Sequence, residues 1–97
     1  PAAPVVDPSA VGTYDVKYPD GTMAKTVINA DGTFVDTDSK GVEEKGMFTR
    51  NGDKDCFDPE GDKPAECWTS SAPGADGSFT STSPDGKTTV TVSRASP

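Results

Sequence analysis

Five dipeptides that favour tight turns divide this chain at short intervals. Each lies between short stretches rich in Thr, Val, Tyr or Phe. They are Asp20-Gly21, Asp31-Gly32, Asn51-Gly52, Asp76-Gly77 and Asp85-Gly86. Asp, Asn and Gly tolerate the backbone angles that hairpin turns need, so these pairs are the strongest short-range signal for a hairpin. The spacing therefore predicts a succession of short antiparallel strands.

The composition favours an all-β fold. The chain has 97 residues, which is enough for one domain, and it contains no Leu and no Gln. Nine Val supply most of its aliphatic content. Helices usually draw on Leu, Glu, Gln, Ala and Met, so little remains to build one. A net charge of −7 with few large apolar residues is also typical of disordered chains. The regular turns argue instead for a folded domain with a thin core.

We expect eight short strands, joined in sequence by short connections. Gly46 lies inside one of them and indicates a bulge or a sharp bend. Such an order predicts an up-and-down meander, and eight strands can close into a small barrel whose interior is filled by side chains. A two-sheet β-sandwich is the alternative. The expected strands cover residues 13–18, 22–29, 33–37, 42–50, 54–58, 66–70, 78–83 and 87–93.

The first ten residues differ from the rest of the chain. Residues 1–10 are rich in Pro and Ala and predict an extended linker, which leaves residues 11–97 as a single β-domain. A linker at this place fits a domain held away from an upstream lipid anchor, such as the modified cysteine of a lipoprotein. The sequence itself shows no membrane span.

Cys56 and Cys67 are the only cysteines, and each precedes an aromatic residue. On neighbouring antiparallel strands they would form a disulfide, which points to an oxidising compartment. Two free thiols are the alternative. Because side chains alternate along a strand, Phe57 and Trp68 point to the face opposite the cysteines. They either belong to the core, which we favour, or form an outward apolar patch that binds a partner.

Several short motifs resemble those of small, largely uncharacterised secreted or lipoprotein β-barrels of Gram-negative bacteria. They are Gly12-Thr13-Tyr14, Asp31-Gly32-Thr33-Phe34, the Cys-Phe and Cys-Trp pairs, and Asp76-Gly77-Ser78-Phe79. The resemblance spans residues 11–93. It implies a periplasmic, outer-membrane-anchored or secreted location, and it brings no established activity.

An acidic segment follows the predicted turn at residue 51. Asp58, Glu60 and Asp62 place oxygen ligands at alternate positions, a pattern that loosely suits calcium. The segment lacks the twelve-residue loop and the closing glutamate of an EF-hand. A solvated acidic loop is the simpler interpretation, so we expect no cofactor unless it is calcium.

The chain carries little that indicates catalysis. It has no histidine, which excludes a nucleophile activated by His. Two pairs of carboxylates, Asp36 with Asp38 and Asp53 with Asp55, each share a strand face. Paired acids can cleave glycosides, but a charged outer face explains these pairs without chemistry. We therefore expect a protein that is not an enzyme.

The net negative charge of the chain limits the kinds of molecule that it is expected to bind. With a net charge of −7 and only Arg50 and Arg94 as arginines, the chain is poorly suited to nucleic acid or to an anionic membrane surface. We expect a monomeric binding or structural module of the bacterial envelope with a protein partner, and the negative charge favours a basic one. One alternative is an inhibitor of a basic enzyme such as lysozyme. Another is a calcium- or small-ligand-binding barrel, although we expect the seven aromatic residues and nine valines to fill the interior and leave little room for a ligand.

Overall fold

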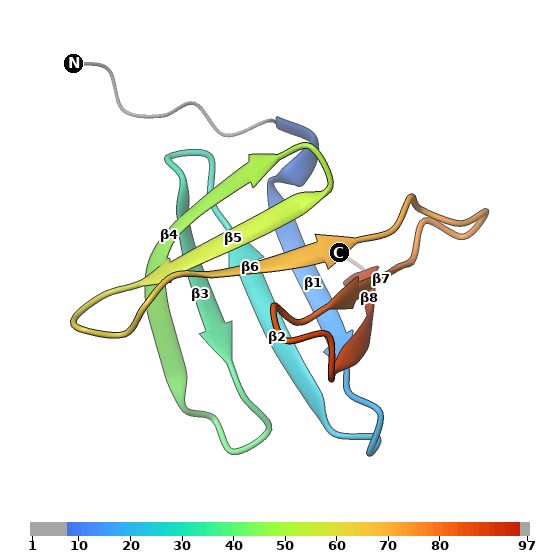
Figure 1. Ribbon diagram of the computed structural model, residues 1–97, viewed down its shortest axis with the longest axis horizontal. Helices are drawn as coiled ribbons and strands as arrows, with labels where there is room; N and C mark the ends of the chain where they lie inside the picture. Colours follow the sequence, from blue (N-terminus) through green and yellow to red (C-terminus); the bar gives the residue numbers. More distant parts are fainter. Residues whose placement is uncertain (1–7, 96–97) are drawn as a thin grey trace.

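The computed structural model describes residues 8–95 and shows an all-β protein (Figure 1). One turn of 3-10 helix, Pro8–Ala10, precedes the first strand. The strands are β1 (Gly12–Lys17), β2 (Met23–Ile28), β3 (Thr33–Thr37), β4 (Glu43–Asn51), β5 (Lys54–Pro59), β6 (Glu66–Ser70), β7 (Phe79–Thr82) and β8 (Thr89–Arg94).

The eight strands form a closed up-and-down barrel. Each strand pairs antiparallel with the next one along the chain, and β1 also pairs with β8, which removes both sheet edges. The prediction of a closed barrel is confirmed, and the sandwich alternative is wrong. The expected strand bounds differ from the observed ones by at most two residues.

Glycine supplies the unusual backbone angle at the turns, and the preceding aspartate acts through its side chain. Among residues 8–95, only glycines have a positive φ. In the β1–β2 turn, the amide of Gly21 donates to the carbonyl of Tyr18, while Asp20 Oδ1 accepts hydrogen bonds from the amide and the hydroxyl of Thr22. The same local contacts join Asp31 to Thr33 and Asp76 to Ser78. These aspartates therefore serve the turns.

The disulfide lies on the outer face of the barrel. Cys56 and Cys67 stand directly opposite each other on β5 and β6, and an S–S bond of 2.11 Å joins them. The predicted disulfide is confirmed. Phe57 and Trp68 consequently point into the barrel, where they pack beside the core.

The Pro8–Ala10 turn packs against the barrel. Ala10 is fully buried, and the Tyr14 hydroxyl donates to its carbonyl over 2.7 Å. The Arg94 guanidinium donates to the carbonyls of Ser9 and Val11. The expected linker of residues 1–10 therefore includes three residues that belong to the barrel, because one turn of 3-10 helix tolerates a proline and places a small alanine inside. Residues 1–7 lie outside the described part of the chain.

An aromatic cluster forms the centre of the core. The Phe57 ring lies 5.1 Å from the Phe34 ring and 5.2 Å from the Phe48 ring, measured between centroids, and Phe34 meets Phe57 edge to face. Tyr14, Ile28, Val90 and Val92 complete the buried set along with Ala10. The core is thin, as the composition predicts.

Gly46 lets two strands approach closely. It pairs in regular register with Phe34 on β3 and with Pro59 on β5, so β4 has no bulge at this point. A Cβ atom at position 46 would overlap the carbonyl oxygen of Asp58. The glycine is therefore required by the close contact between β4 and β5.

Candidate functional site

The barrel contains a cavity of about 220 Å³, open in part to solvent, between its inward-facing side chains. The cavity exists because few large aliphatic side chains point inward. Of the seven valines within residues 8–95, three line it, which are Val16, Val90 and Val92. Small residues, Ala24 and Ser81, occupy other inward positions. The expectation of a filled interior is therefore wrong.

Aromatic side chains form much of the cavity wall. Tyr18, Phe57, Trp68 and Phe79 are each partly buried and line the cavity. Phe57 and Trp68 thus contribute to an internal surface rather than to an outward patch. Apolar and aromatic walls with a few polar groups are typical of sites that hold small molecules.

Three polar side chains lie side by side at the cavity end formed by the β1–β2 and β3–β4 hairpins. Thr26 stands opposite Asp36, and Asp36 stands opposite Glu44, on three consecutive strands. The Thr26 hydroxyl donates to Asp36, and Lys63 Nζ lies 2.8 Å from Glu44 Oε2. Glu66 of β6 lines the same cavity. We call Asp36, Glu44 and Glu66 the acidic end.

The acidic end perturbs two ionisable groups. Burial raises the pKa of the Asp36 carboxyl; the hydrogen bond from Thr26 opposes this, and the charge of Glu44 adds to it. Burial also raises the pKa of the Tyr18 hydroxyl, and the charges of Asp36 and Glu66 raise it further. The Tyr18 hydroxyl therefore stays protonated and neutral, close to the negative charges of Asp36 and Glu66.

The acidic end of the cavity borders a hollow on the outer surface of the barrel. A hollow on the surface of the barrel is lined by four of the residues that also line the cavity, which are Tyr18, Ala24, Asp36 and Glu44. A small molecule entering here would pass the carboxylates before it met the aromatic walls.

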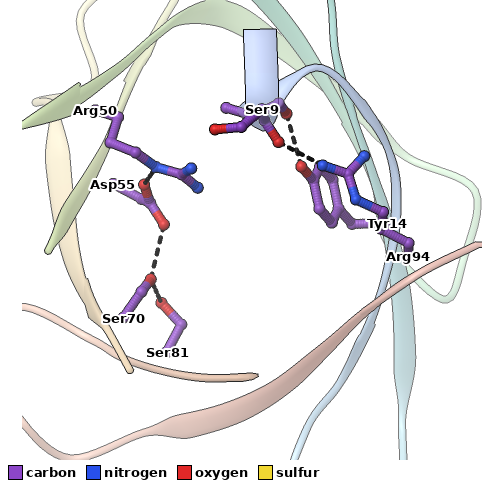
Figure 2. Close-up of polar contacts among 8 residues, drawn as sticks. Ser9, Tyr14, Arg50, Asp55, Ser70, Ser81 and Arg94 are labelled. Atoms are coloured by element: carbon purple, nitrogen blue, oxygen red, sulfur yellow. Dashed lines mark hydrogen bonds and ion pairs between the residues drawn. The ribbon is translucent and has the colours of Figure 1, made fainter. Parts of the chain in front are cut away.

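The opposite end of the cavity carries polar groups that pair with one another (Figure 2). Asp55 is only 6% exposed; its carboxylate accepts from Arg50 Nε and from the Ser70 hydroxyl, each over 2.7 Å. The Ser70 hydroxyl lies 3.0 Å from that of Ser81. The positive charge of Arg50 is thus balanced by Asp55 inside the barrel.

Arg94 is held at the same end by the N-terminal turn. Its guanidinium lies 5.0 Å from the centroid of the Tyr14 ring and donates to backbone carbonyls of the N-terminal segment (Figure 2). A cation over an aromatic face is a favourable contact. These contacts connect β8 and β1 to the Pro8–Ala10 turn, so Arg94 has a structural role.

The structure does not assemble the candidate calcium ligands. Among residues 8–95, no group of three or more His, Cys, Asp or Glu side chains lies close enough to hold a metal ion. Asp58 is exposed on β5, while Glu60 and Asp62 are exposed in the loop after it. Calcium binding stays a prediction from the sequence alone.

The two carboxylate pairs are also separated. Asp38 and Asp53 lie exposed in turns, whereas Asp36 and Asp55 point into the barrel. The interpretation of both pairs as a charged outer face is therefore wrong for Asp36 and Asp55. A sequence signal was present: Asp36 follows the buried Phe34 by two positions, so the period of a strand puts it on the same face.

Comparisons with family models, with curated proteins and with solved structures found no match for this chain. The resemblance to secreted and lipoprotein barrels stays a prediction. No helix within residues 8–95 is long and apolar enough to cross a bilayer.

Proposed function

We propose that this protein is a non-enzymatic binding module that holds a small amphipathic molecule inside its barrel. The observation that carries the proposal is the cavity of about 220 Å³ with aromatic walls and polar groups at both ends. Close packing is the rule in protein interiors, so a void of this size in so small a domain suggests a ligand site. This choice favours the small-ligand alternative among the functions considered from the sequence.

The experiment is a titration with a neutral probe that fits the cavity. 3-Phenyl-1-propanol has an aromatic ring, a short chain and a hydroxyl, and it carries no charge. We expect saturable binding with Kd on the order of 1 mM or below, given the usual limits of affinity per atom for so small a ligand. Calorimetry and the amide shifts of 15N-labelled protein would measure it.

A matched pair of variants locates the binding site. Ala24→Leu introduces a larger side chain at a position that lines the cavity. Lys25→Leu introduces the same leucine at the next residue, which is exposed. We expect Ala24→Leu to weaken binding strongly and Lys25→Leu to leave it unchanged. Absence of binding to the wild type, or equal binding by both variants, would contradict the proposal.

We also propose that the protein works in an oxidising compartment outside the cytoplasm. The Cys56–Cys67 disulfide supports this, because such bonds persist mainly in exported proteins. Thiol labelling of the protein taken directly from its native host tests the proposal. We expect no free thiol, and full labelling of both cysteines would contradict it. A protein partner in the envelope, including a basic enzyme such as lysozyme, stays a prediction from the net charge.

A further inference from the structure

The acidic end contains a pairing of like charges that the fold itself does not need. Asp36 and Glu44 stand directly opposite each other on β3 and β4, and both point into the cavity. Like charges directly opposite in an antiparallel pair are destabilising. A barrel interior would be better filled here by neutral or apolar side chains.

The contacts present offset this repulsion only in part. The group that hydrogen-bonds to Asp36 is the Thr26 hydroxyl, which is neutral. Glu44 pairs with Lys63, but the Lys63 side chain is 72% exposed, and exposed ion pairs contribute little. Glu66 brings a third carboxylate to the same cavity. The cavity therefore keeps an excess of negative charge at this end.

The other end of the cavity has no comparable excess of charge. Among residues 8–95, Arg50 is the one basic residue that lines the cavity, and the Asp55 carboxylate balances its charge at 2.7 Å. Arg94 lies outside the cavity lining and donates to backbone carbonyls. A charged ligand would thus be selected at the acidic end, and the sign of its charge would be positive.

The carboxylates are also arranged for an organic cation rather than for a metal ion. Within the described residues 8–95 they form no group close enough to ligate a metal. Tyr18 lies within the electrostatic influence of Asp36 and Glu66, and the Trp68 ring lines the same cavity. Aromatic faces and carboxylates together are suited to ammonium groups, which gain from cation–π contact and from charge attraction.

We propose that the barrel selects a small amphipathic cation, an amine or a quaternary ammonium compound with an aromatic or aliphatic body. The positive group lies beside Asp36 and Glu44, and the apolar body lies among Phe57, Trp68 and Phe79. This inference rests on the proposed function and adds the charge of the ligand to it.

Three probes of one shape test the inference. 3-Phenylpropylamine is cationic at pH 7, 3-phenyl-1-propanol is neutral, and 3-phenylpropanoate is anionic. We expect the amine to bind about tenfold more tightly than the alcohol, as attraction to nearby carboxylates in a largely aqueous opening allows, and the carboxylate to bind most weakly. Added salt should reduce the preference for the amine and leave alcohol binding unchanged.

Matched variants show whether the acidic end causes the preference. We expect Asp36→Asn and Glu44→Gln each to reduce amine affinity several-fold while alcohol binding persists. Asp58→Asn removes the same charge from the exposed outer face of β5 and should leave the preference intact. Alcohol binding serves as the check that each variant keeps a folded cavity.

The outcomes separate the two proposals. If the alcohol binds and the amine binds no better, or if 3-phenylpropanoate binds best, the inference about charge is wrong while the cavity site stands. If the amine preference survives in both Asp36→Asn and Glu44→Gln, the acidic end is not its source. If none of the three probes binds, the proposed function fails, and this inference fails with it.

Discussion

Asp36 is a residue whose surroundings oppose its charge. It is partly buried, it faces Glu44, and the Thr26 hydroxyl that donates to it is neutral. Natural proteins keep such groups mostly where a function needs them, since burial of a charge lowers stability. A substitution that removes the charge of Asp36 therefore tests whether this charge lowers the stability of the free protein.

We predict that Asp36→Asn stabilises the ligand-free protein. An asparagine keeps an oxygen to accept the Thr26 hydrogen bond and removes the repulsion from Glu44. The free energy of unfolding at pH 7 should rise by about 0.5–1 kcal/mol, the size of a cross-strand pair effect. Urea unfolding followed by Trp68 fluorescence measures it, with Asp58→Asn as the control. A loss of stability in Asp36→Asn would show that the charge supports the fold.

The pH dependence of stability should show two opposite contributions. Hydrogen bonds from Thr22, Thr33 and Ser78 lower the pKa of Asp20, Asp31 and Asp76 below the ordinary 3.8. These aspartates stabilise the fold above pH 3.8, and that stability is lost as pH falls through their lower folded-state pKa values. Asp36 has a raised pKa, so its protonated form favours folding, and this contribution is lost as pH rises through the folded-state pKa.

A comparison of two proteins across pH separates these contributions. The stability advantage of Asp36→Asn over wild type should be full at pH 7 and should shrink as Asp36 becomes protonated. Both proteins should lose stability together below pH 3.8, where the turn aspartates become neutral. Urea unfolding of both proteins, measured in steps of about one pH unit from about pH 2.5 to about pH 7, tests this. An advantage that stays constant with pH would mean that the charge of Asp36 is not its source.

The hairpins could be predicted from sequence because each turn is specified locally. The Asp-Gly-Thr and Asp-Gly-Ser segments place a glycine at the left-handed position, and the aspartate carboxylate accepts from the amide two residues further on. No distant residue is needed for these contacts. Gly46 is different, since the requirement for glycine comes from the backbone of β5. The sequence predicted a bulge or a sharp bend there, and the structure shows a close approach of two strands in regular register.

At the scale of the strand, we predict that Gly46→Ala is strongly destabilising. The new methyl group would overlap the carbonyl of Asp58 in the neighbouring strand, and backbone cannot move aside cheaply. We expect a loss of about 2 kcal/mol or more. Gly74→Ala is the matched control, because a Cβ there meets only ordinary contacts at 3.6 Å. Equal stability of the two variants in thermal and urea unfolding would contradict the close-approach account.

The disulfide should stabilise the β5–β6 hairpin and, through it, the barrel. It closes a loop with a sequence separation of 11, for which the chain-entropy model gives about 3 kcal/mol. The paired variant Cys56→Ala/Cys67→Ala should lose stability by about this amount. Urea unfolding of the variant and of the oxidised protein checks the prediction. A change below about 0.5 kcal/mol would mean that the unfolded chain is already restricted in this region.

At the scale of the whole molecule, closure was predictable and the cavity was not. Eight strands in sequence order favour closure because it removes exposed edges. The cavity depends on which side chains point inward, and this is set by the register of all eight strands together. Val27, Val35 and Val42 could have filled the interior but lie at outward or exposed positions, whereas Ala24 and Ser81 lie at inward ones.

The same argument explains the acidic end. Asp36 and Glu44 are ordinary charged residues along the sequence, separated by a turn. Only the β3–β4 register places them opposite each other, and only closure gives them a common cavity with Glu66. The chemistry of the interior is thus a property of the assembled barrel.

The measurement that tests this account most directly is a set of intermolecular nuclear Overhauser effects between 3-phenylpropylamine and isotope-labelled protein. We predict that the phenyl protons contact the Phe57 and Trp68 rings, while the methylene beside the nitrogen contacts the Asp36 and Glu44 side chains. Contacts only with the exposed apolar residues Met23, Val42 and Met47 would place the ligand outside the barrel and contradict the account.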